Sequence, residues 1–189
     1  MKKALLVIDA QNIYTNPTSG YYVEEQEQII GNINRLLEIL KKEDSLIVYI
    51  AHKNSIDGSD SGRMYDYTGE VGEVEFVDGS DEVEYDSSLL IVDGMHLTKH
   101  KYDAFVGTDL YNILKNNGVE KVVITGFMTN FCCESTARTA HDLDFFVDFV
   151  KDAMGTPGTE ECSPEELTKA TCSTIENGFG NIVMTEDYL

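Results

Sequence analysis

Three short runs of apolar residues do most to limit what this chain can fold into. They are ALLVI at 4–8, LIVYIA at 46–51 and KVVIT at 121–125. Nearly continuous apolar runs of this length are typical of strands that helices cover on both faces of a sheet. The segment 24–42 differs, because its apolar residues recur at helical spacing. This alternation predicts a parallel sheet between two layers of helices.

The rest of the chain repeats the alternation. We expect further strands at 97–99, 145–150 and 182–184, and further helices at 108–117, 131–143 and 163–177. The last helix has a clear start, since Ser163 suits the N-cap, Pro164 the first helical position and Glu166 completes a capping box. Gly118 is a suitable residue to follow the helix at 108–117. The predicted fold class is α/β, with three layers (α/β/α) around a mainly parallel, doubly wound sheet of six strands.

The chain of 189 residues fits one domain, 1–189, with a sizeable buried core. Its unusual connection is the acidic segment, 55–88, which is rich in glycine, serine and acidic residues and has one basic residue, Arg63. Its carboxylates are those of Asp57, Asp60, Asp66, Glu70, Glu73, Glu75, Asp78, Asp81, Glu82, Glu84 and Asp86. A connection this long in a compact α/β protein is usually functional or mobile. We expect it to cover the active site and to contact an oligomer partner.

The charge and the cysteines limit the partners and the compartment. The net charge is −20, with 34 acidic and 14 basic residues, and a field of this sign repels nucleic acids and anionic membranes, so we expect neither as a partner. No apolar run approaches the roughly 20 residues that span a bilayer. The run after Lys2 and Lys3 ends at Asp9, which makes it too short for the core of a signal peptide, about 7–15 residues. With no export signal and with Cys132 and Cys133 adjacent, we expect reduced thiols and a cytoplasmic protein.

Three polar residues fall where predicted strands end. Asp9 directly follows the first strand, Lys99 ends a later one, and Cys132 lies in the turn after KVVIT. In open parallel sheets, ligands bind beyond the carboxyl ends of the strands, near the point where the strand order reverses. The three side chains are therefore candidates for one active site.

A cysteine in this position suits nucleophilic catalysis. Backbone amides at a helix N-terminus stabilise a thiolate, and a nearby Lys99 ammonium is expected to lower the pKa of Cys132 further. Asp9 would take the thiol proton and later give it to a leaving group. Each residue also has a plain structural interpretation, with Cys132 as a small core residue, Asp9 as a partner of a loop and Lys99 as a surface lysine.

Three blocks of sequence resemble one known family. They are VIDAQ at 7–11, TKHKYDAFVGTDL at 98–110 and ITGFMTNFCCESTAR at 124–138. The blocks occur in the order found in the isochorismatase-like hydrolases, and the resemblance covers nearly the whole chain outside the acidic segment. It implies a three-layer α/β/α fold with a Rossmann-like strand order. It also implies a hydrolase that needs no cofactor and forms a homo-oligomer, either a dimer or a tetramer.

The resemblance assigns a catalytic triad to Asp9, Lys99 and Cys132. Lys101 competes for the role of the lysine, but it lies two positions late in its block. Cys133 competes for the role of the nucleophile, but one residue further along a helix is turned by about 100°, which predicts a place in the core.

The resemblance also assigns the surroundings of the nucleophile. It implies a cis peptide bond between Phe127 and Met128, and an oxyanion hole formed by the backbone N–H groups of Met128 and Cys132. Four side chains are candidates for substrate contacts, although each is equally credible as packing or as a satisfied polar contact: Gln11, His52, Phe105 and Phe131.

Departures from relatives narrow the reaction. Nicotinamidases of this superfamily hold a metal with an Asp and two His near the second strand, including an Asp-x-His motif, whereas this chain reads Ala-His-Lys-Asn at 51–54. We therefore expect no metal, and His52 as a polar contact or a hydrogen-bond donor to substrate rather than a ligand. We also do not expect true isochorismatase activity, because the dianionic substrate of that enzyme would be repelled by a protein of charge −20.

The expected activity is metal-independent hydrolysis of a small carboxamide, ureido or carbamoyl compound through a thioester, with release of ammonia. One alternative is the hydrolysis of a vinyl ether, in which Asp9 is the acid and Cys132 matters less. Another is a non-catalytic binding module on the same fold.

Overall fold

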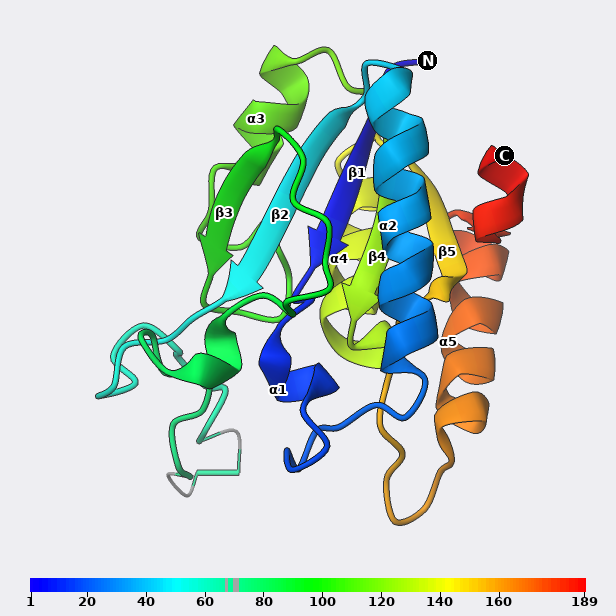
Figure 1. Ribbon diagram of the computed structural model, residues 1–189. Coiled ribbons are helices and arrows are strands. Elements are labelled where there is room, and N and C mark those ends of the chain that lie inside the picture. The colour runs from blue at the N-terminus through cyan, green and yellow to red at the C-terminus, as the bar shows by residue number, and fades with distance from the viewer. Residues whose placement is uncertain (67, 70–71) are drawn as a thin grey trace.

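The sheet has six strands, all parallel, in the order β3-β2-β1-β4-β5-β6 (Figure 1). The computed structural model describes residues 1–66, 68–69 and 72–189. The strands are β1 (Lys3–Ile8), β2 (Leu46–His52), β3 (Met95–Lys99), β4 (Lys121–Phe127), β5 (Phe146–Gly155) and β6 (Asn181–Val183). This order confirms the predicted doubly wound, three-layer α/β/α fold.

The strand order reverses at the centre of the sheet. β1 pairs with β2 on one side and with β4 on the other, and the chain moves outwards in both directions from this pair. The loops that follow β1 and β4 therefore diverge beyond the carboxyl edge, which is where open α/β sheets bind ligands.

Helices cover both faces of the sheet. The helix α2 (Gln26–Lys42) lies on one face, and α3 (Leu110–Asn116), α4 (Glu134–Asp142) and α5 (Pro164–Gly178) pack on the other (Figure 1). The side chains of β1 alternate between the two cores, with Leu5 and Val7 packed on the side of α2 and Leu6 and Ile8 on the opposite side. All four are fully buried, and each such burial stabilises the fold by about 1.5–3 kcal/mol. This double burial explains why the apolar run at 4–8 has no polar interruption.

Two predicted helix boundaries are confirmed by their backbone chemistry. Ser163 Oγ accepts a hydrogen bond from the Glu166 amide, and the Glu166 carboxylate accepts one from the Ser163 amide, which completes the capping box of α5. Gly118 has φ +68° just beyond the end of α3, where an achiral residue is favoured.

Other boundaries differ from the prediction. Residues Thr129–Cys133 form a π-helical turn, so the regular helix α4 begins at Glu134 rather than at 131. β5 continues beyond 150 to Gly155, across a shift in its register with β4. Three short helices were not predicted, because four or fewer residues show no periodicity: α1 (Asn12–Thr15), η1 (Asp81–Val83) and η3 (Thr185–Tyr188).

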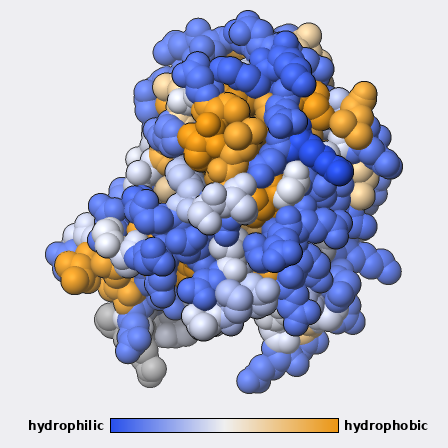
Figure 2. Space-filling model, viewed as in Figure 1, coloured by the Kyte–Doolittle hydropathy of each residue, from blue (hydrophilic) through white to orange (hydrophobic). Residues whose placement is uncertain are grey.

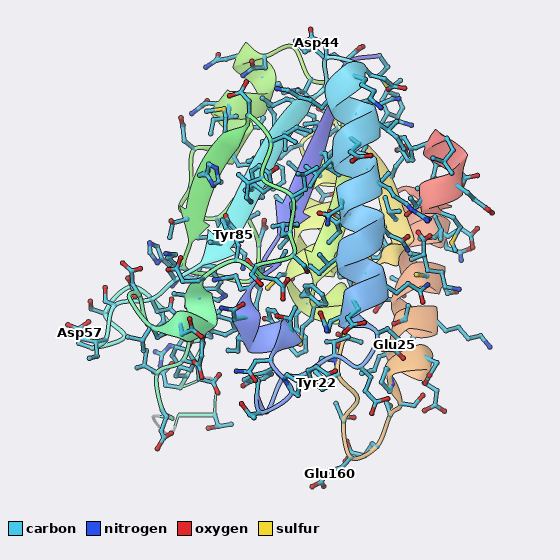
Figure 3. The ribbon with its side chains drawn as sticks, viewed as in Figure 1. Tyr22, Glu25, Asp44, Asp57, Tyr85 and Glu160 are labelled. Carbon is cyan, nitrogen blue, oxygen red and sulfur yellow. The ribbon has the colours of Figure 1, made fainter. Side chains whose placement is uncertain are left out.

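The long polar loops of the chain lie beyond the carboxyl ends of the strands. Tyr22, Asp57 and Glu160 mark three of them at one end of the molecule, and Asp44 lies at the opposite end (Figure 3). Isolated bridges join the acidic segment to the residues that follow β1 and β2, with Tyr85 opposite Gln11 and Val77 opposite Asn54. Of its carboxylates, Glu70 lies outside the described residues.

The surface agrees with the composition. Hydrophilic side chains cover most of the face seen in Figure 2, and hydrophobic ones are confined to a few small areas. Within the described residues, no helix has the length and the hydropathy that crossing a bilayer requires.

Candidate active site

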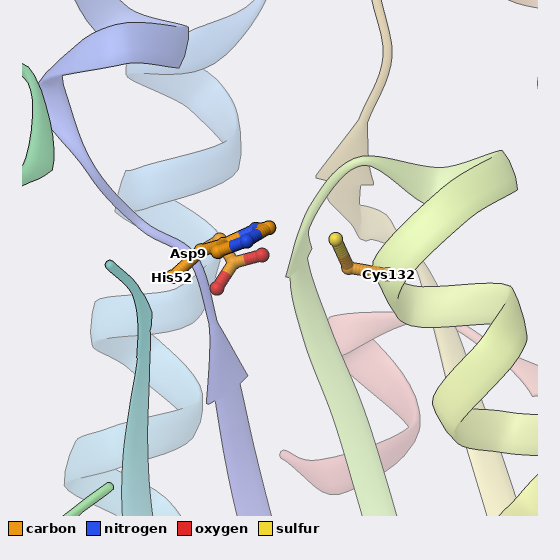
Figure 4. Close-up of side chains that lie close together, drawn as sticks. All are labelled: Asp9, His52 and Cys132. Carbon is orange, nitrogen blue, oxygen red and sulfur yellow. The ribbon is translucent and has the colours of Figure 1, made fainter. Parts of the chain in front are cut away.

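Asp9 lies immediately beyond the end of β1. Its φ is +49°, a conformation that residues other than glycine seldom adopt and that is concentrated at functional sites. Its amide donates a 2.8 Å hydrogen bond to the carbonyl of Ile50 in β2, which fixes the turn against the neighbouring strand. The side chain is fully buried, and its carboxylate lies on the side that faces Cys132 (Figure 4).

Lys99 is the last residue of β3 and is fully buried. Its Nζ lies 2.8 Å from Asp9 Oδ2 and 3.3 Å from Cys132 Sγ, and it donates a 3.0 Å hydrogen bond to the carbonyl of Lys101. A buried ammonium is tolerated only when such partners replace its hydration. Lys99 therefore joins the carboxylate and the thiol into one cluster.

Cys132 lies in the π-helical turn between β4 and α4, a type of irregularity that is frequent at functional sites. The turn follows Gly126, whose φ is +112°. A Cβ atom at this position would lie 1.8 Å from the carbonyl oxygen of Ile8, so only glycine allows β4 to approach the end of β1 this closely. This approach brings the turn beside Asp9.

The peptide bond between Phe127 and Met128 is cis, at the position that the resemblance implies. The carbonyl of Met128 accepts hydrogen bonds from the amides of Phe131 and Cys133, each of 3.2 Å. These contacts hold the turn compact around Cys132, whose side chain points from the turn toward β1 (Figure 4).

The ionisation of the cluster follows from its burial and its internal charges. Burial raises the pKa of Asp9 above its ordinary value, and the charge of Lys99 opposes the shift without cancelling it. Burial acts to lower the pKa of Lys99, but the adjacent Asp9 and Cys132 outweigh it, so this pKa is raised. The lysine therefore stays an ammonium, and Asp9 is a stronger base than an exposed carboxylate.

The expectation of a lowered thiol pKa was wrong. Burial raises the pKa of Cys132 to about 12, and the charge of Lys99 opposes this while Asp9 reinforces it. The physical reason is that the thiol is fully buried and that the Lys99 ammonium is already paired with the Asp9 carboxylate. The resting thiol is protonated and needs a base within the site.

A cleft of about 970 Å³ opens over this cluster, and Cys132 and His52 line it. Its walls come from the loop after β1, the acidic segment, the turn around Cys132 and the loop after β5. Its aromatic lining is formed by Tyr14, Tyr21, Tyr65, Phe76, Tyr102 and Phe131. The acidic segment thus covers part of the site, as expected. Phe76 was missed by the sequence analysis, because nothing in its local pattern marks its φ of +55° or its place against His52.

The four candidate contact residues separate into two groups. His52 and Phe131 line the cleft. Gln11 is fully buried, and its amide donates to the carbonyls of His52 and Val83, so it joins loops instead of facing the cleft. Phe105 packs in the core against Phe145, with 6.3 Å between ring centroids, and does not line the cleft.

The side chains of the two competing residues have other partners. Cys133 is fully buried in the core on the side of α4, with its Sγ 3.9 Å from the carbonyl oxygen of Thr125. Lys101 Nζ donates to the carbonyl of Asp60 in the acidic segment. Neither makes the contacts that unite Lys99, Asp9 and Cys132.

Asp9, His52 and Cys132 are the one group of potential metal ligands among the described residues, with ligand atoms within 4.8 Å of one another. The donor set does not fit a resident cation. Lys99 Nζ already lies 2.8 Å from Asp9 Oδ2 and 3.3 Å from Cys132 Sγ, so a metal ion would be held against a buried ammonium.

Known proteins are similar to this chain in both sequence and fold. A family model described as an isochorismatase domain matches residues 3–187. The uncharacterised isochorismatase family protein YwoC of Bacillus subtilis is 30% identical over 190 residues, covering 100% of this chain and 93% of that protein. Nicotinamidase 3 of Arabidopsis thaliana is 32% identical over 184 residues, covering 95% of this chain and 83% of that protein.

Among solved structures, a cysteine hydrolase from Pseudomonas syringae superposes with a TM-score of 0.88 at 28% identity. The superposition covers 98% of this chain and 90% of that one.

Proposed function

Because the chain belongs to the isochorismatase family of hydrolases, we propose that it is a metal-independent cysteine amidase that releases ammonia from a small carboxamide, ureido or carbamoyl compound. The observation that carries the proposal is the position of Lys99 Nζ, within 3.3 Å of both Asp9 Oδ2 and Cys132 Sγ at the edge of a cleft. A base, a cation and a nucleophile in direct contact are what acyl transfer requires.

The first half of the reaction forms a thioester. Asp9 takes the proton of the Cys132 thiol as sulfur attacks the carbonyl carbon, and the buried Lys99 ammonium balances the negative charge that develops. The backbone N–H groups of Met128 and Cys132 hold the oxyanion. The C–N bond then breaks, and Asp9 returns the proton to the leaving nitrogen, which departs as ammonia.

The second half restores the enzyme. Asp9 takes a proton from a water molecule as its oxygen attacks the thioester carbon. The C–S bond breaks, the product leaves as a carboxylic acid or carbamic acid, and the proton held by Asp9 returns to Cys132. The raised pKa of Asp9 supports this role, because a base that must both take and return a proton works best with a pKa near the working pH.

The substrate class rests on three supports. Nicotinamidase 3, a relative over 95% of this chain, bears the name of an amide hydrolase. Six of the side chains that line the cleft are aromatic and most of its lining surface is apolar, which suits a small and largely uncharged compound. The charge of −20 opposes the approach of a strongly anionic one.

The proposal is tested by ammonia release from a panel of small primary amides, ureides and nicotinamide in the presence of a chelator. Wild type is compared with Cys132→Ala, and Cys133→Ala is the matched control because the adjacent thiol lies in the core. We expect release that resists the chelator, falls by at least about 10³-fold in Cys132→Ala and survives in Cys133→Ala. Turnover of a vinyl ether that survives in Cys132→Ala, with no release of ammonia from any amide, would contradict the proposal.

A further inference from the structure

His52 is a buried histidine at the wall of the catalytic cleft. The residue is 1% exposed, and neither Nδ1 nor Nε2 has a hydrogen-bond partner among the described residues. A buried polar group without a partner is costly and calls for a specific explanation. Because the ring lines the catalytic cleft, a bound molecule is the natural partner.

The surroundings of His52 hold the ring in one place. The Gln11 side chain accepts a 2.9 Å hydrogen bond from the His52 amide and donates one of 3.0 Å to its carbonyl. Phe76 stacks on the ring at 4.4 Å between centroids and an interplanar angle of 11°. Phe76 adopts φ +55°, a rare conformation for a bulky residue, so the backbone is strained where it delivers this ring.

The ring is also kept neutral. Burial lowers the pKa of His52 to about 2, and the charges of Lys99, His100 and Lys101 act in the same direction, while the side chain of Asn54, which can hydrogen-bond to one ring nitrogen, opposes them. A neutral imidazole carries one nitrogen that accepts a hydrogen bond and one that donates. Beside the ammonium of Lys99, the site therefore offers an acceptor with no charge of its own.

The position of the ring relative to the reacting groups is specific. One ring nitrogen of His52, a carboxylate oxygen of Asp9 and Cys132 Sγ lie within 4.8 Å of one another. The ring and the carboxylate lie side by side and face the thiol across the site (Figure 4). An amide whose carbonyl carbon approaches the sulfur would place its nitrogen between two acceptors, because Asp9 is still a carboxylate before it takes the thiol proton.

We propose that His52 and Asp9 each accept one N–H of the scissile carboxamide nitrogen, so that His52 makes the enzyme selective for primary amides. The inference rests on the proposed amidase function and adds a specificity determinant to it. A primary amide has two N–H groups and satisfies both acceptors, whereas an N-alkyl amide satisfies one and pushes its alkyl group against the other.

The test uses an adduct that does not depend on knowing the natural substrate. Isocyanic acid, supplied as cyanate, adds across its C=N bond to the Cys132 thiol and gives a thiocarbamate with a terminal NH₂. Methyl isocyanate gives the same adduct with NHCH₃. The rates of both additions are measured by mass spectrometry of the peptide that carries Cys132, and their ratio is compared among wild type, His52→Phe and His52→Gln.

His52→Phe keeps an aromatic ring against Phe76 but removes the hydrogen-bond acceptor, and His52→Gln keeps a neutral polar group. The two variants therefore separate an effect on packing from an effect on recognition of the N–H group. We expect the preference for cyanate over methyl isocyanate to fall about tenfold in His52→Phe and to recover in part in His52→Gln. A change in thiol reactivity alone alters both rates together and leaves their ratio unchanged.

An unchanged ratio in both variants would overturn the inference and leave His52 as a packing residue. The failure of the proposed amidase function is recognised separately, by ammonia release that survives in Cys132→Ala. Once an amide substrate is found, its N-methyl derivative provides the same comparison through kcat/KM.

Discussion

Lys99 Nζ and Asp9 Oδ2 lie 2.8 Å apart, and neither side chain is exposed to solvent. The pair carries no net charge, so a protonated Cys132 thiol can lie against it without an unbalanced charge in the site. Lys99 acts to lower the pKa of the thiol, but burial and the neighbouring Asp9 carboxylate raise it by more, so the net shift is upward. The site is therefore built to create a thiolate during the reaction instead of storing one.

The first prediction concerns the stability of this pair. Lys99→Met leaves the Asp9 carboxylate buried without its partner, and we expect the free energy of unfolding to fall by about 3–5 kcal/mol. The double variant Asp9→Asn, Lys99→Met removes both charges and should lose less than the sum of the single variants. Urea unfolding at pH 7 measures the coupling energy, expected at about 1–3 kcal/mol, and strictly additive losses would contradict it.

The second prediction concerns the reactivity of the resting thiol. With its pKa raised to about 12, Cys132 should react with iodoacetamide at a rate that rises about tenfold per pH unit well above pH 9. The rate is measured on the tryptic peptide, with the partly exposed Cys162 as an internal reference. A plateau below pH 8 would show a preformed thiolate.

Asp9→Asn sharpens this prediction. Without the carboxylate, the ammonium of Lys99 has only the sulfur to pair with, so the thiol pKa should fall and alkylation at pH 8 should accelerate. Hydrolysis should nevertheless be lost, because the base that moves the proton is gone. Slower alkylation in Asp9→Asn would contradict the assignment of Lys99 as the partner of Asp9.

The third prediction is a pH dependence of stability caused by His52. Its pKa is lowered to about 2 in the folded protein, so below its ordinary value of 6.5 the unfolded chain binds a proton that the folded chain does not. Stability from this group is present above pH 6.5 and is lost as the pH falls. Between pH 7.5 and 5.0, wild type should lose about 2 kcal/mol more than His52→Phe. Parallel unfolding curves for the two proteins would contradict the prediction.

The fourth prediction compares two glycines with positive φ. Gly126→Ala forces a Cβ to 1.8 Å from the carbonyl oxygen of Ile8 and should cost at least about 3 kcal/mol or prevent folding. Gly118→Ala meets no atom within 4 Å and should cost only about 1 kcal/mol of backbone strain. If thermal unfolding shows that the two variants lose the same stability, the close approach of β4 to Ile8 does not explain the requirement for glycine at position 126.

The sequence carries the parts of the fold that depend on local chemistry. Runs such as 4–8 predict buried strands because both faces of the sheet are covered, and the Ser163 capping box predicts the start of α5 to the residue. The π-helical turn at Thr129–Cys133 could not be predicted, because it depends on hydrogen bonds to the carbonyl of Met128 that no periodic pattern in the sequence indicates. The continuation of β5 to Gly155 likewise depends on a register shift against β4.

For the site, the sequence predicts which residues end strands but not how deeply they are enclosed. Asp9, Lys99 and Cys132 meet because the strand order brings three strand ends together. The predicted direction of the pKa shift of Cys132 was wrong, because burial is the largest cause of the shift and depends on the fold of the whole chain. For Phe105 the sequence left a substrate contact and core packing equally open, since an aromatic residue near a motif carries no sign of which face it will take, and the structure places it in the core.

Trapping the acyl-enzyme tests the role of Cys132 as nucleophile most directly. Wild type mixed with a primary amide that it hydrolyses is quenched in acid within one turnover, and the peptide that carries Cys132 is weighed. We expect a gain in mass equal to the substrate less ammonia, located on Cys132, removed by hydroxylamine and absent in Cys132→Ala. Turnover with no adduct at this cysteine, continuing in Cys132→Ala, would contradict it.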